Sequence, residues 1–260
     1  RRFAKDAVLA TAFGYHELRA GWLSRLLGLA TSAYPPQRDR VGMSIGYLER
    51  AHRGRLLDVG CGNGSFLLEM RRLGWEIQGV EIDPEAVGEA RAHDVPVVAA
   101  DLERANFGDG SFEAVMINHV IEHVLDPIAL LAECRRVLRA GGRLVILTPN
   151  ADSLGHRRHR RFWWALDPPR HLFLFSPSTL AVCAERVGLE IVTTRSSPRL
   201  AHRTWTASDL IQKTGIGPPR GRASTLSTQA GSVVFQALED IMVSARHELG
   251  EELVLVSTKR

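Results

Sequence analysis

One stretch, residues 56–67, constrains this chain more than any other, and it reads LLDVGCGNGSFL. Its apolar start predicts a buried parallel strand, and its end predicts the beginning of a helix. Between them stand Gly60, Gly62 and Gly64, which let the backbone turn tightly and approach a ligand closely because they carry no side chain. Asp58 places a carboxylate beside this turn. The arrangement predicts a site for a nucleotide-type cofactor.

Two kinds of cofactor compete for this turn. A dinucleotide site has the spacing Gly-x-Gly-x-x-Gly and holds a pyrophosphate at the helix N-terminus. Here the spacing is Gly-x-Gly-x-Gly, and the preceding acid would repel a pyrophosphate but would attract a cation. The run resembles the first motif of the class I S-adenosylmethionine-dependent methyltransferases, whose loop holds the methionine part of the cofactor, with its amino group and sulfonium. The residues that the resemblance assigns to this part are Asp58, Gly60, Cys61, Gly62 and Gly64. We interpret Cys61 as a small packing residue and not as a nucleophile.

A second predicted strand, residues 76–81, also ends in an acid. Glu81 follows the first glycine of the turn by about twenty residues, where an acid can accept both ribose hydroxyls of a nucleotide. Asp83 is the alternative, but with Pro84 behind it we expect it to cap the next helix. Ile82 would then pack on the face of the adenine.

A third acid follows a short apolar segment, residues 95–102, which we predict to be a strand. Asp101 fits the carboxylate that contacts the exocyclic amine of adenine in the resembling family, and the backbone amide of Leu102 would meet a ring nitrogen. Consecutive parallel strands that end in Asp58, Glu81 and Asp101 would bring the three acids to one edge of the sheet.

The next segments continue the alternation of strands and helices. Residues 112–118 predict a fourth strand that ends at Asn118, and residues 143–148 predict a fifth. Between them a helix begins near Pro127 and is expected to stop at the small residues 140–142. We predict a further helix before Gly188, a sixth strand over residues 190–194 and a seventh over residues 252–257.

The fifth strand and the Thr-Pro-Asn run that follows it are similar to the type 11/23 subgroup of these methyltransferases. With the glycine turn and the other strand ends, the resemblance covers residues 50–200. It implies an α/β fold, a Rossmann-like three-layer sandwich whose seven-stranded, mostly parallel sheet has an antiparallel last strand. It also implies S-adenosyl-L-methionine as the cofactor, and we add Asn118 to the residues expected to contact it.

The domain organisation that we expect has two parts. Residues 1–50 form an N-terminal helical cap, with helices over residues 7–13, 22–27 and 41–50 and a break at Tyr34-Pro35-Pro36. Residues 51–260 form the methyltransferase domain. It includes a substrate loop over residues 151–175 and a helical insertion over residues 197–250, in which we read a short helix at 208–214 and an amphipathic helix at 234–245. The leading helices either shape the substrate pocket or only pack on the edge of the sheet.

Basic and aromatic residues interleave in the substrate loop, at residues 156–164. One interpretation is a solvated basic turn with its tryptophans buried beneath it. The other is a loop that grips an anionic or lipid-like acceptor, which leaves open a contact with a membrane surface. Such a short basic stretch makes nucleic acid an unlikely partner.

The composition of the chain indicates which class of protein it belongs to and where it is located. The chain has 260 residues, a net charge of +4 and three widely spaced cysteines, a pattern without paired metal-ligand spacing. No apolar run approaches the ~20 residues that a membrane-spanning helix needs. We therefore expect a cytoplasmic globular protein with a small-molecule substrate.

The expected reaction is methyl transfer to a small-molecule acceptor, most simply to a hydroxyl oxygen, by direct in-line displacement. The candidate bases are His119, His123 and His171, and we favour His171 and then His123. Glu122 and His123 resemble the Glu-His pair of quinone-ring O-methyltransferases, some of which hold a divalent metal there. Because His119 stands where those enzymes carry another glutamate, we expect no metal. The alternatives are N- or C-methylation, a cofactor-binding subunit without catalysis, and a nicotinamide oxidoreductase.

Overall fold

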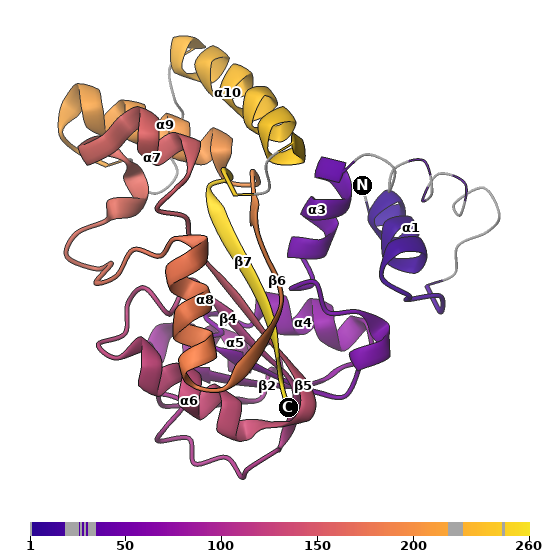
Figure 1. Cartoon of the computed structure of the whole chain (residues 1–260). Coiled ribbons are helices and arrows are strands. Elements are labelled where there is room, and N and C mark those ends of the chain that lie inside the picture. The colour runs from indigo at the N-terminus through magenta and orange to yellow at the C-terminus, as the bar shows by residue number, and fades with distance from the viewer. Residues whose placement is uncertain are drawn as a thin grey trace.

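A central sheet organises the computed structural model, which describes residues 2–18, 26, 28, 30, 35–217, 226–245 and 248–260. Its strands are β1 (Arg55–Val59), β2 (Glu76–Glu81), β3 (Val97–Ala99), β4 (Phe112–Asn118), β5 (Leu138–Pro149), β6 (Leu189–Ser197) and β7 (Glu252–Lys259). They lie in the order β3-β2-β1-β4-β5-β7-β6, and β7 runs antiparallel to both β5 and β6 (Figure 1). The predicted α/β fold, with a mostly parallel sheet and an antiparallel last strand, is confirmed.

Helices cover both faces of this sheet. On one face, α4 (Ser65–Arg72) and α5 (Pro84–Ala92) share a core with the N-terminal segment. On the other face, α6 (Pro127–Val137) and α8 (Pro177–Arg186) share a second core. Because β1 lies between β2 and β4 and its last four residues are buried, the glycine turn leaves the middle of the sheet. This position is where ligands bind in open α/β sheets.

The helix beginnings follow the local signals in the sequence. The side chain of Asp83 accepts a hydrogen bond from the amide of Glu85 at the N-terminus of α5. Asp126 does the same for the amides of Ile128 and Ala129 at α6. Such caps satisfy amides that have no partner inside the helix. Asp83 therefore has the capping role that the sequence predicted for it.

The N-terminal segment differs from the prediction. It contains α1 (Arg2–Ala12), α3 (Pro35–Met43) and the 3-10 turn η1 (Arg50–His52). The prolines form the first turn of α3, where proline is tolerated, so the helix that follows the predicted break begins at Pro35 and not at residue 41. The end expected at residue 50 is also wrong, since α3 ends at Met43, and Gly46 and Tyr47 in the turn that follows have φ of 58° and 52°. The helix expected over residues 22–27 lies almost wholly outside the described residues.

Two strand boundaries also differ. β3 covers only Val97–Ala99, so Asp101 follows the strand instead of closing it. β5 begins at Leu138 and runs through the small residues 140–142, which we expected to stop the preceding helix. Leu138 pairs with Phe112 before the register shifts, so pairing with β4 extends this strand beyond its apolar run.

A group of three helices lies beyond the end of the sheet at which β7 begins (Figure 1). They are α7 (Leu154–His159), α9 (Ala201–Thr214) and α10 (Leu226–Ala245), with the 3-10 turns η2 (Arg160–Phe162) and η3 (Trp164–Leu166) after α7. The short helix predicted at residues 208–214 is the second half of α9, which begins earlier, at Ala201. None of the helices among the described residues is both long and apolar enough to cross a membrane.

The amphipathic helix predicted at residues 234–245 forms the second half of α10, but its apolar side faces solvent. Val234, Leu238 and Ile241 are more than half exposed, at 59%, 52% and 68%. The inward side is mixed, because Phe235 and Val243 are buried in it and polar residues beside them tie the helix to its neighbours. Gln236 Nε2 donates to the carbonyl of Pro198 at 2.9 Å, and Asp240 pairs with an arginine of α3.

Candidate cofactor and acceptor site

The glycine turn after β1 has the backbone that its sequence predicts. Gly60, Gly62 and Gly64 have φ of +70°, +53° and +76°, a region that residues with a side chain rarely adopt. A Cβ on Gly60 would also lie 2.4 Å from Cγ2 of Val120. A Cβ on Gly62 would meet nothing within 4 Å, so the turn is open on that side. The open side leaves room for a ligand against the backbone.

Glu81 joins the end of β2 to this turn. Its Oε2 accepts a hydrogen bond from the amide of Gly62 at 2.9 Å. Its Oε1 accepts from the amides of Ile82 and Asp83 at 2.8 and 2.9 Å. Three amide donors therefore fix the carboxylate, while its remaining lone pairs can still accept from hydroxyl groups. Its contact with a ribose stays a prediction.

Asp58 lies beneath the turn and is nearly unsolvated. It is 3% exposed, and its Oδ1 is buried without a hydrogen-bond partner in the described part of the chain. Burial, with the nearby charge of Glu81 as the second cause, raises the pKa of Asp58 to about 8. A buried acceptor without a donor is costly, and a cationic ligand group would satisfy it. The residues present therefore fit a cofactor that carries an amino group and a sulfonium.

The structure places the other expected contact residues around the same edge. Ile82 is 74% exposed, as a residue that packs on a ligand ring would be, and Asn118 is exposed at the end of β4. Asp101 is half-exposed and pairs with Arg104 at 3.5 Å, while the side chain of Leu102 is buried. Glu81 and Ala99 are register partners, so the segment with Asp101 follows the strand next to Glu81. None of these positions by itself tests the predicted contacts.

Cys61 has the packing environment that we expected. It is 8% exposed, and a Cβ on Gly79 of β2 would lie 2.5 Å from its Sγ. Gly79 therefore makes the space in which the thiol lies. Burial, with the charges of Asp58 and Glu81 added to it, raises the pKa of Cys61 to about 12. A thiol with so high a pKa is a poor nucleophile.

His119 follows β4 and lies between two carboxylates. Its Nδ1 is 3.1 Å from Oε1 of Glu122, and its Nε2 is 2.8 Å from Oε1 of Glu252. Burial alone would lower the pKa of His119, but the hydrogen bonds and charges of the two glutamates raise it to about 9. Both ring nitrogens then carry protons, and the imidazolium has no lone pair for a reacting proton. The structure therefore argues against His119 as the base.

Two further groups complete this network. Arg199 donates to both oxygens of Glu252 at 2.9 and 2.7 Å, and Thr148 donates to Oε2 of Glu122 at 2.9 Å. Burial opposes the ionisation of Glu252, but His119 and Arg199 outweigh it and lower the pKa to about 2. Sequence reasoning missed Glu252 and Arg199, because they lie far from His119 in the chain. The only local signal was an acid at the start of an apolar strand.

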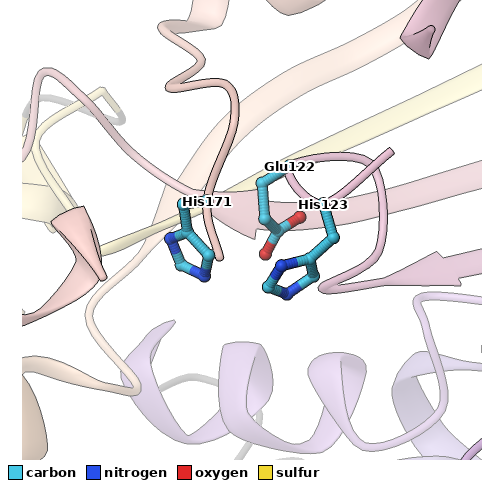
Figure 2. A group of neighbouring side chains, drawn as sticks. All are labelled: Glu122, His123 and His171. Carbon is cyan, nitrogen blue, oxygen red and sulfur yellow. The ribbon is translucent and has the colours of Figure 1, made fainter. Parts of the chain in front are cut away.

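His123 and His171 approach each other from separate segments, as Figure 2 shows. Their ring centroids lie 4.7 Å apart at an interplanar angle of 66°. The Nδ1 of His123 is 2.9 Å from the carbonyl of Arg170, and the Nδ1 of His171 is 2.7 Å from the carbonyl of Ala165. A carbonyl only accepts, so each Nδ1 carries a proton, and the neutral form of each ring has its lone pair on Nε2. Either Nε2 can therefore take a proton from an acceptor.

The carbonyl of Glu122 holds the loop that brings His171 to this place. It accepts from the amides of Leu172 and Phe173 at 2.8 and 3.3 Å. The side chains of Glu122, His123 and His171 also offer ligand atoms that lie within 4.8 Å of one another. This set has the donor types of a divalent cation site, and our expectation that no metal binds stays a prediction.

The basic segment of the predicted substrate loop lies in α7 and η2. Trp163 is 2% exposed and donates from Nε1 to Oε2 of Glu251 at 3.0 Å, so this tryptophan is part of the core beneath the loop. Arg158 lies over the ring of Trp205, with 5.6 Å from its Cζ to the ring centroid. The exposed guanidinium groups leave a basic surface, but its role as an acceptor-binding loop stays a prediction.

Comparison with known proteins identifies the fold of this site. A solved S-adenosylmethionine-dependent methyltransferase from Archaeoglobus fulgidus is 22% identical, with a TM-score of 0.54 over 89% of this chain and 93% of that one. The phosphoethanolamine N-methyltransferase 2 of Haemonchus contortus, in complex with S-adenosyl-L-methionine, is 16% identical. Its TM-score is 0.53 over 80% of this chain and 49% of that one.

The sequence comparisons agree. A "Ubiquinone biosynthesis O-methyltransferase" from Xanthomonas oryzae pv. oryzae (strain PXO99A) is 39% identical over 103 residues, 37% of this chain and 43% of that protein. The match thus spans less than half the length of this curated relative. The family model described as "Methyltransferase domain" matches residues 21–194, which is most of the chain. The chain therefore belongs to the methyltransferase-domain family, within the class I S-adenosylmethionine-dependent methyltransferases.

Proposed function

We propose that this protein transfers the methyl group of S-adenosyl-L-methionine to a hydroxyl oxygen of a small-molecule acceptor, by direct in-line displacement. The observation that carries the proposal is the pair of Nε2 atoms on His123 and His171, which lie on the segments after β4 and β5. The printed name of the Xanthomonas relative, an O-methyltransferase, supports the same acceptor atom. The acceptor of this chain is a separate question, because the match covers only part of each protein.

The cofactor site in this proposal is the edge formed by the ends of β1 to β4. The cofactor supplies a methyl group that its sulfonium already activates. Asp58 and the glycine turn hold the charged methionine part, and Glu81 accepts from the ribose hydroxyls. Ile82, Asp101 and Leu102 surround the adenine. The proposed contact residues are Asp58, Gly60, Cys61, Gly62, Gly64, Glu81, Ile82, Asp101, Leu102 and Asn118.

The catalytic residues in this proposal are His171 and His123. An acceptor hydroxyl has to lose its proton as its oxygen attacks, and a positioned base contributes about 10²–10⁴-fold to such a step. One of the two Nε2 atoms takes this proton, while the Nδ1 proton of the same ring stays on its backbone carbonyl. His171 is the better placed of the two, because its side chain is 10% exposed and its ring is therefore held more firmly.

A methyl-transfer assay tests the proposal. Purified protein is incubated with methyl-labelled S-adenosylmethionine and a panel of dihydroxyaromatic, amine and carbon acceptors, and we expect label on a hydroxyl oxygen. His171→Ala and His123→Ala should each lower kcat by about 10²-fold or more, because the base is lost. His93→Ala, an exposed histidine on the far side of the cofactor strands, is the matched control and should be unchanged.

Three results would contradict the proposal. Label on nitrogen or carbon would point to N- or C-methylation. Tight cofactor binding without transfer to any member of the panel would favour a cofactor-binding subunit without catalysis. Full activity of the double variant His123→Ala, His171→Ala would remove both histidines from the chemistry.

A further inference from the structure

A second cavity lies away from the proposed cofactor site. It has a volume of about 450 Å³ and is lined by the segment around Tyr47, by α3, by β6 and by the end of α10. None of the proposed cofactor contacts lines it. It lies on the face of the sheet that carries α4 and α5, since Phe13 and Val256 belong both to its lining and to that core.

Three guanidinium groups line this cavity, those of Arg38, Arg143 and Arg195. Within the described residues, none of them has a carboxylate oxygen inside 4.0 Å. The Nε of Arg143 lies 3.2 Å from Nε2 of His52, and this positive neighbour adds to the effect of burial in lowering the pKa of His52. His52 is therefore a neutral hydrogen-bond acceptor for Arg143 and leaves its charge uncompensated.

Arg195 is the most constrained of the three. Its Cζ lies 3.7 Å from the centroid of the Tyr47 ring, a contact that fixes the plane of the guanidinium. Its Nε is buried and has no hydrogen-bond partner within the described part of the chain. A buried donor without an acceptor is costly, so this group is held ready for an oxygen atom that the protein itself does not provide.

The acids of the cavity do not neutralise these arginines. Asp39 accepts hydrogen bonds from the hydroxyls of Tyr47 and Ser197. Asp240 pairs at 3.3 Å with Arg40, whose side chain is not part of the lining. Glu49 lies at the exposed rim. Among the described residues, none of these three acids has a carboxylate oxygen within 4.0 Å of the nitrogens of Arg38, Arg143 or Arg195.

We infer that this cavity binds a small oxyanion, a phosphate or carboxylate group, on Arg195 and Arg143. Guanidinium groups match such oxygens with two parallel hydrogen bonds, which point charges do not provide. The inference is independent of the methyl acceptor and of the roles of His123 and His171. The oxyanion is carried either by a separate small molecule or by the acceptor itself, and the two sources are distinguishable.

The experiment measures binding of inorganic phosphate and of citrate to the full chain, by calorimetry and by thermal stability, with chloride at matched ionic strength as the reference. We expect saturable binding and a rise in Tm above the chloride reference. Arg195→Gln should weaken binding at least about tenfold, because a charge-assisted hydrogen bond is lost. Arg195→Lys should recover only part of it, since the planar fork is missing.

Arg143→Gln is the second variant, and it should also weaken phosphate binding. It keeps the inference testable if Arg195→Gln impairs folding. Arg186→Gln removes an exposed charge from α8, on the opposite face, and should bind phosphate normally. Each variant is first shown to bind S-adenosylhomocysteine as the unaltered protein does. Saturable binding that Arg195→Gln and Arg143→Gln leave unchanged would overturn the inference, as would no binding beyond the chloride reference.

A second arm separates the two sources. Catechol and 3,4-dihydroxybenzoate are compared as ligands, because they differ by one carboxylate. If the acceptor carries the oxyanion, the carboxylate should tighten binding, and Arg195→Gln should abolish the difference. If a separate molecule carries it, the two phenols should bind alike, and phosphate should bind without displacing either.

Discussion

Two pairs of carboxylates stand at neighbouring strand ends, and their surroundings are opposite. Asp58 near the end of β1 and Glu81 at the end of β2 have no cationic side chain within 4.0 Å among the described residues, and the pKa of Asp58 rises to about 8. Glu122 after β4 and Glu252 at the start of β7 enclose His119, and the pKa of Glu252 falls to about 2. Among the described residues, the first pair of carboxylates has no positively charged partner, whereas the second pair has His119 and Arg199.

The difference separates a binding role from a structural role. A buried oxygen that accepts no hydrogen bond within the protein can accept one from a ligand, and this favours ligand binding. A buried carboxylate that is fully paired holds its neighbours in place, and here the carboxylates of Glu122 and Glu252 fix His119 between them. The two pairs should therefore respond to mutation in different measurements, binding for the first and stability for the second.

The largest effect is expected at the paired site. His119→Gln leaves Glu122 and Glu252 without their shared cation, so the free energy of unfolding should fall by about 3–5 kcal/mol near pH 6. The folded pKa of about 9 lies above the ordinary value of 6.5, so the stabilisation is complete below pH 6.5 and is lost as pH rises through 9. Urea unfolding at several pH values measures this. A deficit that stays constant from pH 6 to pH 10 would contradict the charged form of His119.

A smaller effect, on binding only, is expected at the unpaired site. Glu81→Gln should weaken S-adenosylmethionine binding by about a hundredfold, because charge-assisted hydrogen bonds to the ribose are lost. Isothermal calorimetry measures the dissociation constant, and Glu76→Gln at the exposed start of the same strand is the control. Normal cofactor binding by Glu81→Gln would show that another acid takes the ribose.

The number of protons released when the cofactor binds should further distinguish Asp58 from the paired carboxylates. At pH 7 Asp58 is mostly protonated because its pKa is about 8, and a cationic ligand group favours the ionised form. Cofactor binding should therefore release up to about one proton at pH 7 and none above pH 9.5. Calorimetry in buffers of different ionisation enthalpy gives the number. The same release from Asp58→Asn would assign the proton elsewhere.

The smallest effect is expected from metal removal. Treatment with a chelator, followed by exhaustive dialysis, should leave methyl transfer unchanged, because we expect the two histidines to act as bases and not as ligands. The measurement is kcat before and after treatment, with added magnesium and zinc as separate restorations. If the chelator abolishes activity and one of these ions restores it, the result would show that Glu122, His123 and His171 hold a metal ion.

The sequence predicted the cofactor edge of the fold well, because its signals are local. The glycine turn, the acid of β2 and the caps at Asp83 and Asp126 each depend on a few consecutive residues. The network around His119 was predicted poorly because its contacts join distant segments. The sequence around His119 does not indicate that Glu252 lies beside it. The apolar pattern of α10 does not indicate that Gln236 and Asp240 face the neighbouring elements.

The start of α3 was predicted too late in the chain for a related reason. Pro35 and Pro36 are compatible both with a break between helices and with the first turn of the next one, and α3 begins with them. Pairing with β4 likewise extended β5 through residues whose own propensity opposes a strand.

The packing of Cys61 against Gly79 has a practical consequence for labelling experiments. Cys61 and Cys134 are buried, and burial raises the pKa of both thiols, whereas Cys183 on α8 is partly exposed. A maleimide dye should therefore attach at one position in the native protein, without mutagenesis and without disturbing the glycine turn. Fluorescence from that position would report on the molecule while its three natural cysteines remain in place.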